Sequence, residues 1–173
     1  MSHEPGPRVF EGGGLCPPSG VRVAMAVARW NDAITRRLLA GALHQLASAG
    51  IPAAAIDIAW VPGSFELPFA ADRLAATGRY AAVLCLGAII KGETSHDLHI
   101  ATAAAGGIER VGRERGLPVI FGVLTCDTLA QAMARAGGDA GDGFAGNKGA
   151  ECAAAALEMI ALTAAIAAGG GAS

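Results

Sequence analysis

The fold is decided by AAVLCLGAII at residues 81–90, followed by KGET at 91–94 and SHDLHIATAAAGGIERVGRER at 95–115. The first segment is an uninterrupted apolar run, which is typical of a strand that is buried on both faces. The last segment has the length of a helix. The stretch therefore predicts a buried strand that passes through a short glycine-containing loop into a helix.

The same alternation extends outward in both directions. Apolar runs predict further strands at 21–28, 56–61 and 119–124. Apolar spacing predicts helices at 34–50, 65–77, 128–136 and about 148–168. Strands that alternate with helices predict an α/β protein with a parallel sheet covered on both faces. We expect a flavodoxin-like three-layer sandwich with a four-stranded parallel sheet.

The length of 173 residues suits one domain, which we place at residues 21–168. Residues 1–20 are rich in glycine, proline and charge and predict a flexible arm, and residues 169–173 predict a disordered tail. The residues are 53% hydrophobic, largely through alanine. This excess favours close helix packing and burial of some surface against other subunits.

Several classes of partner are excluded by composition. The net charge is −2 and no basic stripe is present, so nucleic acid is not an expected partner. No apolar run reaches the roughly 18 residues that would span a bilayer, and no secretory signal precedes the first strand. The four cysteines are widely spaced and are expected to be reduced, structural thiols. We therefore expect a cytoplasmic protein that does not contact membranes.

Ligands of such sheets bind beyond the carboxyl ends of the strands, so the loops there are the candidate site. In ARWND at 28–32, Trp30 offers a flat face for stacking a heterocycle, or it is a core residue, and Asn31 can cap the next helix. In VPGSFELP at 61–68, Ser64 can cap a helix. The Glu66 carboxylate either complements the helix dipole or reads donors on a polyhydroxylated ligand.

The loop after the 81–90 strand is the most informative one. Gly92 permits close backbone approach, and residues 93–95 open the helix, so free N–H groups there predict an anion site. His96 follows at once and is a candidate for proton transfer. The alternative is an ordinary capping turn with a solvated histidine. His99 shares a helix with His96, but a third zinc ligand is missing, so we expect no metal.

The fourth loop carries two cations. Arg135 lies near the end of the 128–136 helix, where it either complements the helix dipole or donates a bidentate pair to a phosphate. Asn147 and Lys148 stand at the start of the last helix as a candidate cap and a cation.

Taken together, these segments resemble the lumazine synthase family. The matching motifs are RWN, VPGSFELP, LGAIIKGETSH, FGVLTCDT, ARAGG and GNKGAE, which occur in this order over about residues 21–168. No single motif is decisive, but a collinear set is hard to reach by accident. The resemblance implies condensation of 5-amino-6-(D-ribitylamino)uracil with 3,4-dihydroxy-2-butanone 4-phosphate to 6,7-dimethyl-8-ribityllumazine, a step of riboflavin biosynthesis, without a metal or redox cofactor.

The resemblance also implies roles for individual residues. Trp30 would stack on the pyrimidine, where many family members have Phe. Substrate would further be bound by Ser64, Phe65, Glu66 and the backbone of Ala88, Ile89 and Ile90. Gly92, Glu93 and Thr94 would hold the phosphate, and His96 would transfer protons. Phe121, Arg135 and Lys148 would come from the adjacent subunit, with Arg135 on the phosphate, in a homopentamer or decamer.

Two departures from the family pattern stand out. The segment HDLHI at 96–100 lacks the aromatic that usually follows the histidine, and its acidic residue has moved to Asp97. About five extra residues, 141–145, precede the GNKG turn. The rival functions are a related flavin-pathway condensing enzyme, a flavin- or lumazine-binding carrier, and a structural shell protein on the same fold. Retention of His96, Arg135 and Lys148 favours catalysis, because a carrier needs only the stacking ring and the polar frame.

Overall fold

The computed structural model describes residues 9–12, 18–137 and 144–169. Most of the expected arm (1–20), most of the expected tail (169–173) and residues 141–143 of the insertion lie outside the described residues, as does Cys16.

The described residues form one sheet with helices between its strands. The strands are β1 (Val23–Ala28), β2 (Ile56–Val61), β3 (Ala82–Ile90) and β4 (Val119–Cys126). All neighbours pair in parallel, in the order β2-β1-β3-β4. The helices are α1 (Asp32–Ser48), α2 (Leu67–Ala75), α3 (His96–Arg115), α4 (Leu129–Arg135) and α5 (Lys148–Ala167), with short 3₁₀ turns η1 (Ala53–Ala55) and η2 (Ser64–Glu66).

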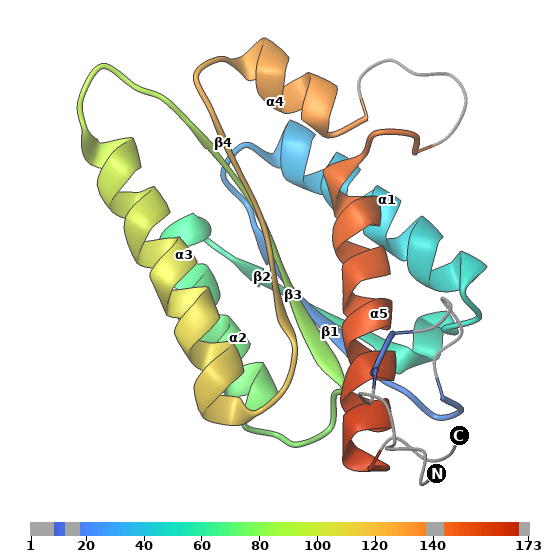
Figure 1. Cartoon of the computed structure of the whole chain (residues 1–173). Helices are drawn as coiled ribbons and strands as arrows, with labels where there is room; N and C mark the ends of the chain where they lie inside the picture. Colours follow the sequence, from blue (N-terminus) through green and yellow to red (C-terminus); the bar gives the residue numbers. More distant parts are fainter. Residues whose placement is uncertain (1–8, 13–17, 138–143, 170–173) are drawn as a thin grey trace, which may run out of the picture.

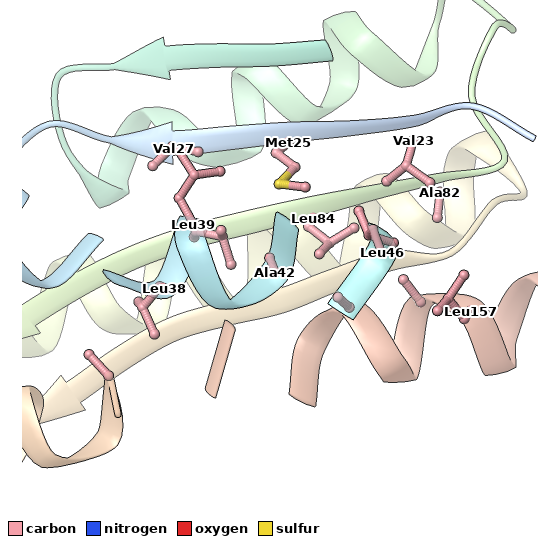
Figure 2. Close-up of a cluster of buried hydrophobic side chains, with 14 of the residues drawn as sticks. Val23, Met25, Val27, Leu38, Leu39, Ala42, Leu46, Ala82, Leu84 and Leu157 are labelled. Carbon is pink, nitrogen blue, oxygen red and sulfur yellow. The ribbon is translucent and has the colours of Figure 1, made fainter. Parts of the chain in front are cut away.

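The sheet is the middle of three layers. Helices α2 and α3 cover one face, and α1 and α5 cover the other (Figure 1). Each face of the sheet has its own apolar core. Side chains of α1 such as Leu39 and Leu46 point toward Met25 and Leu84 of the central strands (Figure 2). The expected flavodoxin-like α/β sandwich with a four-stranded parallel sheet is therefore confirmed.

Burial explains the unbroken apolar runs in the sequence. Alternate residues of a strand face opposite sides of the sheet. Val23 and Met25 of β1 therefore face the core under α1, whereas Ala24 and Ala26 face the core under α2 and α3. Because both faces are covered, every residue of β1 is buried, and a polar residue would fit on neither side.

Most element boundaries differ from expectation by one or two residues, and two of these differences lie close to the candidate site. The helix expected at 65–77 begins as η2 and becomes α-helical only at Leu67. Strand β4 runs past Leu124 because Thr125 and Cys126 pair in register with Ile89 and Ile90 of β3. The second difference lengthens the sheet at the edge where the candidate site lies.

A polar cluster lies at the other end of the strands, where β1, β2 and β3 begin. Asp57 Oδ2 accepts hydrogen bonds from Tyr80 Oη (2.7 Å) and Arg22 Nη2 (2.9 Å), and Arg79 Nη2 donates to Tyr80 Oη (3.0 Å). The hydrogen bonds from Tyr80 and Arg22 lower the pKa of the Asp57 carboxyl below its ordinary value. Burial and the Asp57 carboxylate raise the pKa of Tyr80. The cluster ties together the amino ends of β1, β2 and β3.

The lowered pKa makes a prediction about stability. A carboxyl whose pKa is lower in the folded chain stabilises the fold above its unfolded pKa of about 4 and loses that effect as pH falls through the folded value. Asp57→Asn should therefore reduce stability at pH 7, and its difference from the wild type should shrink at pH 3. Urea unfolding at both pH values measures this. Asp32→Asn, which breaks only the exposed ion pair with Arg36, is the control and should change stability little.

Helix α5 is unusually apolar for its exposure. Within the described part of the chain it is the one helix long and apolar enough to cross a membrane, with a mean hydropathy of 1.6 and 22% of the segment buried. A single helix of this kind is weak evidence for a membrane protein. Its exposed apolar side chains, Met159 and Ile166, are equally consistent with packing against another protein subunit.

Candidate active site

The loops after the strands meet at the carboxyl edge of the sheet. Backbone pairing continues beyond the strands: Arg29 N donates to Val61 O (2.8 Å) and Trp30 N to Pro62 O (3.0 Å). On the other side, Lys91 N donates to Cys126 O (2.9 Å). The loops are therefore held to one another by the same type of bond that holds the sheet.

Asn31 joins the first loop to the third. It has a left-handed backbone conformation (φ 58°), which Asn tolerates better than most residues. Its side-chain Nδ2 donates to Ala88 O on β3 (2.8 Å). Asn31 does occupy the N-cap position of α1, but its side chain makes no capping bond. The expected cap is thus in the expected place but performs a different task, fixing the end of β3.

Trp30 packs on the second loop. A Cβ atom added to Gly63 would lie 2.5 Å from Trp30 Cε3, so the indole rests directly on the glycine backbone. The side chain is nevertheless 62% exposed, which excludes the alternative of a core tryptophan. One side of the ring is supported and much of its surface is open to a ligand.

The turn at 63–66 departs from expectation. Ser64 caps no helix; it is buried, and its Oγ lies beside Gly87 of β3. The capping bond comes instead from Glu66, whose Oε2 accepts from Gly63 N (2.9 Å). The expectation of a Ser64 cap was wrong, because a 3₁₀ turn places this serine inside the turn rather than before it.

Helix α3 begins beside these loops. Ser95 occupies its N-cap position without a side-chain capping bond, and His96 is the first helical residue. The first N–H groups of a helix lack partners within it, and the helix dipole adds a partial positive charge there. His96 is exposed and the loop 92–95 before it is exposed as well. An anion can therefore approach this helix end from solvent.

A pocket of about 260 Å³ lies between the first three loops. It is lined by Trp30, Asn31, Ser64, Ala88, Ile89, Ile90, Gly92, Thr94, His96, Asp97 and Ile100. A second pocket of about 460 Å³ adjoins it and shares Ile89, Gly92, Thr94 and Asp97 with it. In the second pocket Lys91 Nζ lies 3.8 Å from Asp127 Oδ1.

The structure brings together eight of the residues singled out from the sequence and leaves six outside this pocket. Glu93 lines the adjoining pocket. Phe65 and Glu66 belong to the second loop but are absent from the lining. Phe121 is exposed on β4, Arg135 is exposed in the last turn of α4, and Lys148 Nζ pairs with Glu151 Oε2 (2.5 Å).

Three lining residues were not among the candidate site residues. Asn31 was interpreted only as a cap, and Asp97 only as a displaced acid. Ile100 lies four residues after His96, so helical spacing alone would have placed it on the same face. The sequence held no signal for the bond from Asn31 to Ala88, because the two residues are far apart along the chain.

Charge is distributed unevenly in the site. No Lys or Arg lines the 260 Å³ pocket within the described parts of the chain. The permanent charge that its lining does hold is the carboxylate of Asp97. An anion bound there would have the α3 amino end and the Thr94 hydroxyl as donors, while Lys91 of the adjoining pocket is paired with Asp127.

The fold and this pocket define an α/β protein with a cavity beyond the carboxyl ends of a parallel sheet, the usual place of a small-molecule site in such folds. A family model for 6,7-dimethyl-8-ribityllumazine synthase matches residues 20–164, which is most of the chain. The protein therefore belongs to the lumazine synthase family, and its function lies in riboflavin biosynthesis. The resemblance drawn from the motifs is confirmed.

Proposed function

We propose that this protein is a lumazine synthase transferase, which condenses 5-amino-6-(D-ribitylamino)uracil with 3,4-dihydroxy-2-butanone 4-phosphate. The observation that supports this most directly is the shared pocket of Trp30, His96 and the α3 amino end. A stacking ring, a proton-transfer group and a phosphate-type site are then within one small volume. The pyrimidine would stack on Trp30, and the sugar phosphate would bind at the α3 amino end.

The chemistry asks for positioning and proton transfer. The aromatic 5-amino group attacks the ketone carbon, and loss of one water leaves a Schiff base. The C–O bond to phosphate then breaks and inorganic phosphate leaves. The ribitylamino nitrogen closes the ring with loss of a second water, giving 6,7-dimethyl-8-ribityllumazine. Holding both substrates in reactive geometry and moving protons through His96 suffice, and no enzyme nucleophile is needed.

We further propose that each active site is completed by the adjacent subunit, which would supply Phe121, Arg135 and Lys148. The lack of Lys and Arg in the described lining supports this, because a phosphate is usually held by charge-assisted bonds. Phe121 and Arg135 are exposed in the single chain and free to reach a neighbour. Phe65, Phe69 and Leu98 add exposed apolar surface that such contacts would cover.

Direct assay separates this function from its rivals. Purified protein with both substrates should produce the fluorescent lumazine together with inorganic phosphate. A carrier or a structural shell would bind the pyrimidine or the product but release no phosphate. A related condensing enzyme that uses two lumazine units would form riboflavin from the lumazine alone. We expect a cytoplasmic enzyme that needs no added metal or cofactor.

Arg135 gives the next prediction. If its guanidinium holds the phosphate in a bidentate pair, Arg135→Lys keeps the charge but loses the fork. The KM for the sugar phosphate should rise about tenfold, the equivalent of about 1.4 kcal/mol, while the KM for the pyrimidine stays nearly unchanged. Steady-state kinetics with each substrate varied in turn measures both values. An equal rise of both would indicate a role in folding or assembly.

For assembly, we propose a closed pentamer, alone or paired as a decamer, and not a 60-subunit shell. A heterologous contact must close into a ring to avoid open fibres, and a ring completes every shared site. The insertion 141–145 lengthens the connection to α5, where extra residues would crowd the contact between pentamers. Phe144, one of its two described residues, packs on His44 of α1, with ring centroids 4.9 Å apart.

Mass photometry tests the assembly. The main particle should have close to five or ten times the chain mass of 17.2 kDa. A particle of about one megadalton, near sixty chain masses, would show that the insertion does not block shell formation. Deletion of residues 141–145 is the matched variant, and any shift toward large particles should occur there first.

A further inference from the structure

We infer that Asn147 is the positioning residue that sets Arg135 and Lys148 in place relative to the body of the subunit. This inference rests on the proposed function, because it assigns to Asn147 the geometry of the cations that would serve a neighbouring site. Asn147 itself is 1% exposed and is not among the residues that line the 260 Å³ pocket. Asn147 would therefore act on the substrate only through Arg135 and Lys148.

The amide of Asn147 joins three helices. Its Nδ2 donates to Ala136 O at the end of α4 (2.7 Å) and to Arg37 O of α1 (2.9 Å). Its Oδ1 accepts from Gly149 N (2.8 Å) and Ala150 N (3.2 Å) in the first turn of α5. Both side-chain hydrogens and the carbonyl oxygen are thus used, and a buried amide that is fully bonded holds its position firmly.

Two glycines pack closely against the Asn147 side chain and fix its position. A Cβ atom at Gly41 would lie 2.3 Å from Asn147 Oδ1, and one at Gly137 would lie 3.3 Å from its Nδ2. The bulk of a side chain is therefore excluded at Gly41, and little room exists at Gly137. The amide occupies space that two glycines leave open, so its position is set by packing as well as by hydrogen bonds.

The two cations lie directly beside the points that Asn147 holds. Arg135 precedes Ala136, and Lys148 follows Asn147. The bond from Asn147 to Ala136 O therefore fixes the end of α4 against the start of α5, although ten residues separate Ala136 from Asn147 along the chain. Arg135 and Lys148 keep a defined separation, whatever path the inserted residues take.

Two substitutions separate capping from cross-linking. Asn147→Asp keeps an oxygen acceptor for Gly149 N and Ala150 N, because Asp is as good an N-cap as Asn. A carboxylate cannot donate, so at pH 8 the hydrogen bonds to Ala136 O and Arg37 O are lost. The new carboxylate oxygen would instead repel these two carbonyl oxygens. Asn147→Ser also keeps a cap and adds no charge, but it loses the two amide N–H groups that reach Ala136 O and Arg37 O. It guards against failure of the first variant to fold.

The readout is the KM for the sugar phosphate against the KM for the pyrimidine and kcat. We expect both variants to raise the KM for the sugar phosphate by about tenfold. The KM for the pyrimidine and kcat should each change by less than about threefold. Ile160→Val, a core change in α5, is the control for general loosening of that helix and should leave all three values unchanged. Circular dichroism and thermal melts confirm that each variant is folded.

A double-mutant cycle with Arg135→Ala completes the test. If Asn147 acts through Arg135, Asn147→Ser should add less than about twofold to the KM of the sugar phosphate once Arg135 is gone. Effects that multiply with Arg135→Ala and also with Lys148→Ala, equal rises in both KM values, or an unchanged KM for the sugar phosphate would overturn the inference. Wild-type protein that forms no lumazine would overturn the proposed function itself, so the two failures give different results.

Discussion

His96→Ala should lower kcat by about 100-fold, which is within the usual range for loss of a general acid–base group. His96 is the first residue of α3 and lines the same pocket as Trp30 and Thr94. Schiff-base formation, phosphate loss and ring closure each move a proton, so removal of the imidazole should slow turnover. Substrate binding should change little, because the stacking ring and the α3 amino end remain.

The measurement is single-turnover formation of the lumazine alongside a binding titration with the pyrimidine. His99→Ala, on the same helix but outside the pocket lining, is the matched control and should retain nearly full kcat. An unchanged kcat in His96→Ala would remove the proton-transfer role. A loss of affinity at constant kcat would reassign His96 to substrate binding.

Gly149→Ala should lower the stability of the fold more than any other substitution considered above. A Cβ atom at this position would lie 1.9 Å from Leu38 O and 2.5 Å from Leu38 C, both backbone atoms of α1. Neither helix can move aside cheaply, because Asn147 caps α5 two residues earlier and its Nδ2 donates to Arg37 O on α1. Overpacking of this kind costs about 3 kcal/mol or more. For a chain of this length that is a fall in Tm of about 6–12 °C.

Gly106→Ala is the control for the helical glycine itself. A Cβ atom there meets nothing within 4 Å, and alanine favours a helix over glycine by about 1 kcal/mol. Stability should stay level or rise in Gly106→Ala while it falls in Gly149→Ala. Equal melting temperatures for Gly149→Ala and the wild type would show that α1 and α5 separate more easily than their contacts indicate.

The layered fold could be predicted from the sequence because burial on both faces leaves a direct mark. A strand such as β1 has no residue that reaches water, so it must be apolar throughout, and the alternation with helices then requires parallel pairing. The element boundaries were not all predictable. The extension of β4 to Cys126 depends on pairing with Ile90 of β3, which no local pattern encodes.

The candidate site was predicted in part. Trp30 and Thr94 lie in loops that follow strands and His96 begins the next helix, so the topology alone brings them together. The tasks of Ser64 and Asn31 were not predictable, because they depend on contacts with Gly87 and Ala88 of a distant strand. Likewise, the sequence indicated Asn147 as a cap, but its two donated bonds link helices that are remote along the chain.

The hydrogen bonds of Asn147 also determine how well the chain tolerates insertions between α4 and α5. Because the amide bonds Ala136 O and caps α5, both ends of the intervening segment are anchored independently of its length. Lengthening such a segment adds only loop-closure entropy, about 0.6 kcal/mol for each doubling. The 137–146 region is therefore a place where peptides could be inserted for display or purification at low thermodynamic cost, provided that the anchoring amide is kept.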